Sequence, residues 1–501
     1  MKPIKTQWNK QQAIKSIVLF LVYFALLALL SFFLLVGTRL NSLSVVMREN
    51  GSRYLYALCC LFLLVAITYV YFFFENRGIL MSGKNTALLF CVLGLQIGVS
   101  FGVGQMNIYM RPVALVSLLT LMLLGRREAA FMTVIAALAM FVLDNASGAD
   151  AYTQKEIYAS LLIAFSSGIV SIFACACAKT RFRIILVGFI ILIPVLFIIA
   201  LLELTLFVSP EALQGTLPTA EYIFIQMGYG VIGGISSTVL FLAILPIFEW
   251  MFNCLTVYRL RELTSHDSRL LRKLRTEAPG TFNHSVSVAQ LAESCAAALG
   301  ENADFARAAA YYHDVGKLHQ PEYFTENQGD YNLHDELTPE LSADIIRSHA
   351  HDGYELIRSH HLPQLFADVA LQHHGTLPIR YFYAKALKMT DGELNIEDFS
   401  YSGPKPQTRI AAIIMIADAA EASVRALPNR TQETVEEAVR KIIEERMELE
   451  QFSECAITMQ DLALIRRTLV DTLTGVYHRR VSYPGLRYKK GKDGKTEGEN
   501  E

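Results

Sequence analysis

Long apolar runs fill the first half of the chain and constrain what it can fold into more than any other feature. A helix of about 20 apolar residues crosses the hydrocarbon core of a membrane. The fourth and fifth runs are short and are separated by Gly125, Arg126 and Arg127, which predict a tight turn. Eight candidate spans follow from the pattern: 14–36, 53–74, 87–105, 111–125, 128–144, 157–178, 183–207 and 223–252. The sequence therefore predicts an N-terminal transmembrane helical bundle.

Composition supports this division. Only 18% of the 501 residues are charged, whereas about 25% is usual in soluble proteins. The deficit lies in the first half, and the chain from Arg259 onward has the composition of a soluble domain. A net charge of −2 without a basic stripe gives no support for a nucleic-acid partner. The eight cysteines show no paired spacing, so neither a disulfide framework nor a thiolate metal site is indicated.

Lysine and arginine residues indicate the orientation of the bundle, because they concentrate in cytoplasmic loops. Lys2, Lys5 and Lys10 precede the first run, and six basic residues follow the last one between 259 and 275. The short first external loop is basic and is the one exception. We predict a multi-pass protein of the bacterial inner (cytoplasmic) membrane with both termini in the cytosol. A signal peptide is disfavoured because the first run is too long and lacks a cleavage site.

The predicted organisation follows from these runs and from the change in composition. Its parts are a cytosolic N-terminus (1–13), a first span (14–36), a short external loop (37–52), a seven-helix bundle (53–252), a charged coupling helix (253–280), a soluble helical domain (281–484) and a disordered tail (485–501). The spans hold few ionisable residues, which argues against a transporter. The fold class is thus all-α throughout.

Histidines mark the chemistry of the second half, since all twelve follow residue 265. Apolar residues at helical spacing predict helices over Thr281–Leu299, from Pro339, from Pro363 and over Arg409–Arg425. Histidines or acids lie on the buried faces of these helices or at their ends. The set is His284, His313, Asp314, His349, His373, His374 and Asp418.

Each of these residues taken alone has an ordinary structural explanation, because a single buried histidine is usually a hydrogen-bonded core residue. Together they exceed what one metal ion takes from side chains. A carboxylate beside a histidine, as in His313-Asp314, can reach two metals at once, and paired metals are a standard device for phosphate-ester hydrolysis. Imidazole and carboxylate ligands favour iron or manganese over zinc or magnesium. We therefore predict two divalent cations.

At these residues the chain resembles the HD superfamily of phosphohydrolases in its HDIG-type form, through His313-Asp314-Val315-Gly316-Lys317 and the other histidines and acids. The flanking stretches resemble the membrane-bound PgpH-type cyclic-di-AMP phosphodiesterases, which are seven-transmembrane receptors carrying an HD domain. These stretches are Glu277-Ala-Pro-Gly-Thr-Phe-Asn-His284, Tyr311-Tyr-His-Asp314, Glu326-Asn-Gln328, Gln372-His-His-Gly-Thr376 and Pro404-Lys-Pro-Gln407. Family members usually carry a large extracellular domain after the first span, where this chain has only residues 37–53.

The resemblance implies a cytosolic HD domain that opens the second messenger cyclic-di-AMP to linear pApA, under regulation by the membrane bundle. It also implies that the seven residues above are the metal ligands and that Asp314 bridges the metals. A metal-bound hydroxide would attack phosphorus, with Lys317 stabilising charge on the phosphate oxygens. Glu421 and Arg425 share a face with Asp418 and are candidate partners of the ligands.

Substrate contacts are less constrained. Tyr381, Phe382 and Tyr383 are candidates for stacking on adenine, or are ordinary core residues. Asn327 is a further candidate contact, and a homodimer is a candidate assembly. Two other functions stay open: an HD hydrolase of cyclic-di-GMP or an alarmone, and a nucleotide-binding receptor without turnover. The Gly-Tyr-Pro motif of cyclic-di-GMP hydrolases is absent after His374, where Gly375-Thr376-Leu377-Pro378 stands.

Overall fold

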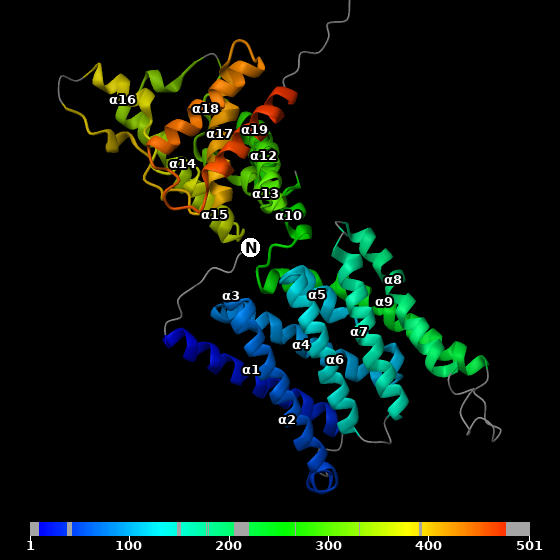
Figure 1. Ribbon diagram of the computed structural model, residues 1–501. Helices are drawn as coiled ribbons and strands as arrows, with labels where there is room; N and C mark the ends of the chain where they lie inside the picture. The colour runs from blue at the N-terminus through cyan, green and yellow to red at the C-terminus, as the bar shows by residue number, and fades with distance from the viewer. Residues whose placement is uncertain are drawn as a thin grey trace, which may run out of the picture. The chain divides into compact units, whose positions relative to one another are not determined.

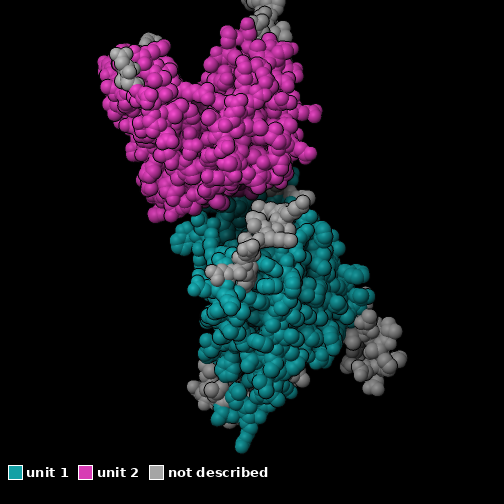
Figure 2. Space-filling model, turned by 60° about the vertical axis from the view of Figure 1, so that its left-hand side comes forward, with its two compact units in different colours: residues 1–259 teal, residues 260–501 magenta. Residues whose placement is uncertain are grey.

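The computed structural model describes residues 10–37, 43–147, 152–176, 178, 180–204, 220–265, 267–329, 331–389 and 393–476. Every regular element within these ranges is a helix, and one isolated antiparallel bridge joins Pro378 and Ser400. The all-α prediction is therefore confirmed for the described residues. The chain divides into two compact units, residues 1–259 and residues 260–501 (Figure 2). The predicted tail, 485–501, lies outside the described residues.

Unit 1 contains the apolar helices (Figure 1). They are α1 (Lys10–Val36), α2 (Leu43–Glu75), α3 (Arg77–Met81), α4 (Gly83–Gly104), the 3-10 helix η2 (Ile108–Met110), α5 (Leu115–Leu123), α6 (Arg126–Ser147), α7 (Gln154–Ala176), α8 (Arg181–Leu204) and α9 (Ala220–Met251). Within the described ranges, seven of them are long and apolar enough to cross a membrane: α1, α2, α4, α6, α7, α8 and α9.

The fourth predicted span, 111–125, is wrong as a full crossing. It forms α5, a helix of 9 residues, which at 1.5 Å per residue is about 14 Å long and far short of the ~30 Å hydrocarbon core. Pro112 interrupts it, because proline has no backbone N–H to donate, and Arg111 has extended backbone angles (φ −61°, ψ 135°). Residues Leu115 to Thr120 are nevertheless all buried. The segment is an internal, broken element of the bundle.

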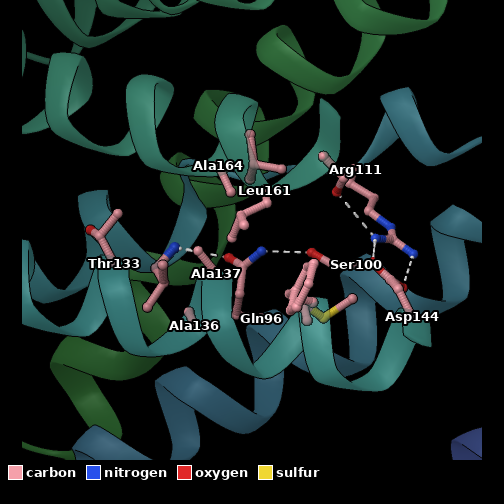
Figure 3. A pocket seen from close by; sticks show the side chains of 14 residues that line it. Gln96, Ser100, Arg111, Thr133, Ala136, Ala137, Asp144, Leu161 and Ala164 are labelled. Carbon is pink, nitrogen blue, oxygen red and sulfur yellow. Dashed lines mark hydrogen bonds and ion pairs between the residues drawn. The ribbon is translucent and has the colours of Figure 1, made fainter. Parts of the chain in front are cut away.

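A buried ion pair holds this broken element (Figure 3). Arg111 is 1% exposed, and its Nη1 and Nη2 donate to the two carboxylate oxygens of Asp144 on α6, at 2.7 and 2.8 Å. The side chain of Gln96 on α4 forms hydrogen bonds with the backbone near Pro112. Its Nε2 donates to the Pro112 carbonyl at 3.2 Å, and its Oε1 accepts from the Val116 N–H at 3.0 Å. Irregular backbone inside a membrane bundle requires such partners. Sequence analysis missed the pair, because its members lie at the ends of different apolar runs.

We predict that Asp144→Leu destabilises the protein, since it leaves the Arg111 guanidinium buried without its counter-charge. Removing one partner of a buried ion pair costs about 3–5 kcal/mol. The double variant Arg111→Met/Asp144→Leu should recover most of this loss, because no buried charge remains. Thermal unfolding of the purified protein in detergent measures both effects. A melting temperature of Asp144→Leu equal to that of the unchanged protein would contradict the structural role of the pair.

The segment predicted as one coupling helix, 253–280, is two short helices, α10 (Val257–Leu263) and α11 (Arg269–Glu277). Polar residues break it, because serine and aspartate side chains bond to nearby backbone and compete with the helix. Ser265 Oγ accepts from the Asp267 N–H at 3.4 Å, and Ser268 immediately precedes α11. The apolar face of α11 is buried as its leucine spacing predicts, through Leu270, Leu271 and Leu274.

Unit 2 is a bundle of shorter helices. They are α12 (Pro279–Ala298), α13 (Ala303–Tyr312), η5 (Val315–His319), η6 (Pro321–Tyr323), η7 (Leu333–Asp335), α14 (Pro339–Ser359), α15 (Gln364–Gln372), α16 (Arg380–Leu387), η8 (Ile396–Phe399), α17 (Arg409–Ala426), α18 (Gln432–Glu448) and α19 (Met459–Val476). Helix α17 lies at the centre, buried from Ile410 to Ala417 and packed against α12, α18 and α19. Threonine side chains cap α14, α17 and α18. The four helices predicted from apolar spacing are all present.

Candidate metal centre

All seven predicted ligand residues converge in unit 2. His284 comes from α12, His349 from α14 and Asp418 from α17. His313 and Asp314 follow the end of α13, and His373 and His374 follow the end of α15. They form two groups, in each of which the potential ligand atoms lie within 4.8 Å of one another. The groups are His284, His313, Asp314 and Asp418, and Asp314, His349, His373 and His374.

Asp314 belongs to both groups and faces each with a different oxygen. Its Oδ2 is 3.4 Å from His313 Nε2 and 3.6 Å from His284 Nε2. Its Oδ1 is 3.4 Å from His349 Nε2 and 3.6 Å from His373 Nε2. The Asp314 side chain is 1% exposed. One buried carboxylate thus joins the two sets of donors, as a bridging ligand does.

Three histidines are fixed in the same way by their own helices. His313 Nδ1 lies 2.7 Å from the Ala310 carbonyl, His349 Nδ1 lies 2.5 Å from that of Ile346, and His373 Nδ1 lies 2.7 Å from that of Ala370. An Nδ1–H donated to a carbonyl fixes the tautomer and leaves the Nε2 lone pair as the donor to a metal. Each Nε2 points to Asp314.

His284 is oriented by a carboxylate. Its Nδ1 is 2.6 Å from Glu421 Oε2, and its Nε2 is 2.8 Å from Asp418 Oδ1. Arg425 forms an ion pair with Glu421. Burial alone lowers the pKa of His284, but the hydrogen bonds to Asp418 and Glu421 outweigh burial and raise that pKa to about 10. This part of the centre therefore attracts positive charge. Of the two candidate partners of the ligands, Glu421 thus contacts His284 directly and Arg425 contacts Glu421.

The donors fit divalent cations. Among the described side chains, His313 Nε2 and Asp314 Oδ1 are buried and have no hydrogen-bond partner, which is costly unless a cation takes the lone pairs. Burial raises the pKa of a carboxyl, yet the charges of Lys317 and His313 hold the pKa of Asp314 well below its usual value. The carboxylate therefore stays ionised. Neither group contains cysteine, so the donor set is imidazole and carboxylate.

Lys317 lies between two carboxylates. Its Nζ is 2.8 Å from Asp314 Oδ2 and 2.7 Å from Glu326 Oε1. Thr281 Oγ1 donates to the same Glu326 oxygen at 3.0 Å. Sequence analysis did not assign a role to Glu326, because it lies in a loop with no periodic signal. The lysine charge is thus matched inside the protein, next to the shared carboxylate.

A cavity of about 750 Å³ opens beside the two groups. Three of the candidate substrate contacts, Tyr381, Phe382 and Lys317, line it. Tyr401 also lines it and stacks on His374, with ring centroids 4.3 Å apart and an interplanar angle of 24°. Sequence analysis missed Tyr401, which stands in an irregular segment between η8 and α17.

Two predicted substrate contacts point elsewhere. The Asn327 amide nitrogen donates to Thr281 Oγ1 at 2.8 Å and to the Pro321 carbonyl at 3.2 Å, so this side chain ties down its loop. Tyr383 packs against Phe399, with ring centroids 5.6 Å apart. Neither residue is part of the cavity wall. Their bonding and packing within the protein exclude them from the lining.

Comparison with known proteins agrees with this division of the chain. A family described as "7TM receptor with intracellular HD hydrolase" matches residues 17–256, and the HD domain family matches residues 281–423. The chain belongs to the family of 7TM receptors with an intracellular HD hydrolase. Membership makes it a membrane protein whose second unit is an HD domain, a fold that binds divalent metal.

Several family members are similar over long stretches. The cyclic-di-AMP phosphodiesterase PgpH of Bacillus subtilis is 36% identical over 427 residues, which are 83% of this chain and 58% of the relative. The protein of the same name from Listeria monocytogenes is 47% identical over 259 residues, which are 52% of this chain and 36% of the relative. The crystal structure of the L. monocytogenes PgpH HD domain in complex with cyclic-di-AMP is 49% identical and covers 43% of this chain and 99% of that one, with a TM-score of 0.41. This chain thus spans little more than half of the length of the B. subtilis protein and about a third of the length of the L. monocytogenes protein.

We predict that Glu421→Gln weakens divalent-cation binding about 10–100-fold, the usual loss when the partner of a ligating histidine is removed. The neutral amide no longer accepts a charge-assisted bond from His284 Nδ1. Titration of the purified protein with Mn²⁺ measures the change. Glu437→Gln is the matched control, because Glu437 lies on the surface of α18 and pairs there with Arg440. Equal affinities of the two variants would contradict the orienting role of Glu421.

Proposed function

We propose that unit 2 hydrolyses cyclic-di-AMP to linear pApA with two divalent cations held by His284, His313, Asp314, His349, His373, His374 and Asp418. The observation that carries this proposal is the division of the two Asp314 oxygens between the two donor groups. The names of the relatives support the choice of substrate. Iron or manganese suits the mixed imidazole and carboxylate donors best.

The residues of the chain have distinct tasks in this proposal. Bound cations supply Lewis-acid activation of water and of phosphoryl oxygens. Asp314 contributes one oxygen to each donor group and so fixes the distance between them. The hydrogen bonds from Nδ1 to backbone carbonyls keep the Nε2 atoms of His313, His349 and His373 directed at Asp314. Lys317 holds Asp314 through its ion pair. It also lines the cavity beside the two donor groups, where its charge can interact with phosphate oxygens of the substrate. Tyr381 and Tyr401 offer aromatic surfaces for adenine.

The membrane unit supports a regulatory role. We propose that unit 1 anchors the enzyme in the cytoplasmic membrane with both chain termini in the cytosol, following the distribution of basic residues. The cavity and the metal groups then have access to a cytosolic second messenger. Regulation through the membrane helices is part of the same proposal.

Asp314→Ala should reduce turnover of cyclic-di-AMP by roughly a thousandfold or more, because two-metal activation is worth several kcal/mol and both donor groups lose their shared ligand. Incubation of the purified full-length protein with cyclic-di-AMP and Mn²⁺, followed by chromatography, detects pApA. Asp344→Ala is the control, since Asp344 is an exposed residue of α14 that pairs with Arg347. Near-normal hydrolysis by Asp314→Ala would refute the assignment.

Chelation followed by addition of single metals tests the cofactor. We predict that the stripped protein is inactive and that Mn²⁺ or Fe²⁺ restores more activity than Zn²⁺ or Mg²⁺. A panel of cyclic-di-AMP, cyclic-di-GMP and an alarmone run on the same samples tests the substrate. Faster hydrolysis of another nucleotide, or binding of cyclic-di-AMP without turnover at any metal, would overturn the proposed function.

A further inference from the structure

Tyr312 is the last residue of α13 and directly precedes His313 and Asp314. It is fully buried. The chain leaves the helix immediately afterwards, and Asp314 has backbone angles of φ −107° and ψ 11°. Because two residues of the metal centre follow Tyr312 without a flexible linker, the position of Tyr312 determines where they lie.

The hydroxyl of Tyr312 is bonded to the segment at the start of unit 2, residues 260–265 and 267–281, here called the lead-in segment. It donates to the Leu263 carbonyl at the end of α10, at 2.6 Å. It also lies 3.1 Å from Ser268 Oγ. The single phenolic proton goes to Leu263, so the serine hydroxyl donates to Tyr312. Ser268 stands at the N-cap of α11 yet makes no side-chain capping bond there, which leaves its hydroxyl for the tyrosine.

The ring of Tyr312 also contacts the helix that precedes two residues of the second donor group. It stacks on Phe366 of α15, with centroids 5.3 Å apart and an interplanar angle of 18°. Helix α15 ends at Gln372, immediately before His373 and His374. Tyr312, at the end of the helix that precedes Asp314, therefore packs against the helix that precedes His373 and His374.

A second route joins the lead-in segment to the same carboxylate. A Cβ atom on Gly280 would lie 1.9 Å from the Glu326 carbonyl oxygen, so the two backbones approach closely there. Thr281 Oγ1 donates to Glu326 Oε1, which is paired with Lys317, and Lys317 is paired with Asp314. Both routes from the lead-in segment, through Tyr312 and through Glu326, end at Asp314.

We propose that Tyr312 is a positioning residue through which the lead-in segment sets the place of Asp314 between the two donor groups, so that displacement of this segment changes cation affinity. Metal sites tolerate errors in ligand distance of only about 0.2 Å, and Tyr312 is bonded directly to the Leu263 carbonyl. A small shift at Leu263 is therefore sufficient to alter the centre. The lead-in segment continues α10, which begins at Val257, only six residues after the end of α9 at Met251. This inference rests on the proposed two-cation function.

Tyr312→Phe in the full-length protein tests the proposal, because it removes the hydroxyl and keeps the ring. Tyr311→Phe is the matched control: it is the same change in the adjacent buried tyrosine, whose ring faces Arg307 at 6.0 Å. Three quantities are compared: Mn²⁺ affinity by titration calorimetry, kcat and KM for cyclic-di-AMP, and the melting temperature without metal. We expect Tyr312→Phe to bind Mn²⁺ about tenfold more weakly, with a kcat that excess Mn²⁺ restores and an unchanged KM. Tyr311→Phe should keep its Mn²⁺ affinity.

Two results would overturn the proposal. One is a Tyr312→Phe protein that melts earlier but binds Mn²⁺ normally, which is what a purely structural role predicts. The other is an equal loss of affinity in Tyr311→Phe. Should Tyr312→Phe fail to fold, Ser268→Ala decides the question, with a smaller loss of Mn²⁺ affinity expected and an unchanged affinity contradicting the proposal. If the unmodified protein binds Mn²⁺ but does not hydrolyse cyclic-di-AMP, the proposed function fails while the affinity comparison still tests this inference.

Discussion

Burial of one ionised carboxylate among histidines is the constraint on which the second unit depends. Asp314 is almost inaccessible to solvent, and an isolated buried carboxylate would lose its hydration at large cost. Lys317 supplies one compensating charge at 2.8 Å. The remaining lone pairs of the carboxylate face the Nε2 atoms of histidines. Where Nδ1–H bonds a carbonyl, as in His313 and His349, Nε2 carries a lone pair and no proton. Bound cations would accept the unpaired lone pairs of the carboxylate and the imidazoles. The surrounding helices fix the positions of these side chains.

Two buried groups of charged residues in the described parts of the chain differ in how completely their members are paired. In unit 1, the Arg111 guanidinium and the Asp144 carboxylate match each other in charge and geometry, with two hydrogen bonds between them. The two charges of that pair cancel, although Arg111 Nε has no hydrogen-bond partner, and the pair holds the segment before α5 inside the bundle. In unit 2, donor atoms exceed the partners that the protein supplies, since His313 Nε2 and Asp314 Oδ1 have no hydrogen bond. An excess of converging donors indicates a binding site, whereas a matched pair indicates a structural one.

Helical periodicity pointed to three of the seven candidate ligands, His284, His349 and Asp418, which lie within helices. The other four lie just past the ends of α13 and α15. His284 continues the buried face of its helix, and Asp418 interrupts an otherwise apolar run, so the cost of burying them pointed to a shared site. The features that were missed carry no local signal. Arg111 lies between η2 and α5 whereas Asp144 lies in α6, and Glu326 and Tyr401 lie in irregular segments. The span predicted at 111–125 failed because hydropathy alone does not register the effect of Pro112. The internal partners of Asn327 and Tyr383, which keep these side chains out of the cavity lining, leave no pattern in the sequence.

A structure of the full-length protein loaded with Mn²⁺, with the metals located by anomalous scattering, tests the central claim most directly. The account predicts two ions about 3.5–4 Å apart, one on each side of Asp314, with His284 and His313 on one ion and His349 and His373 on the other. A single ion, or a pair of ions that Asp314 does not touch, would contradict it.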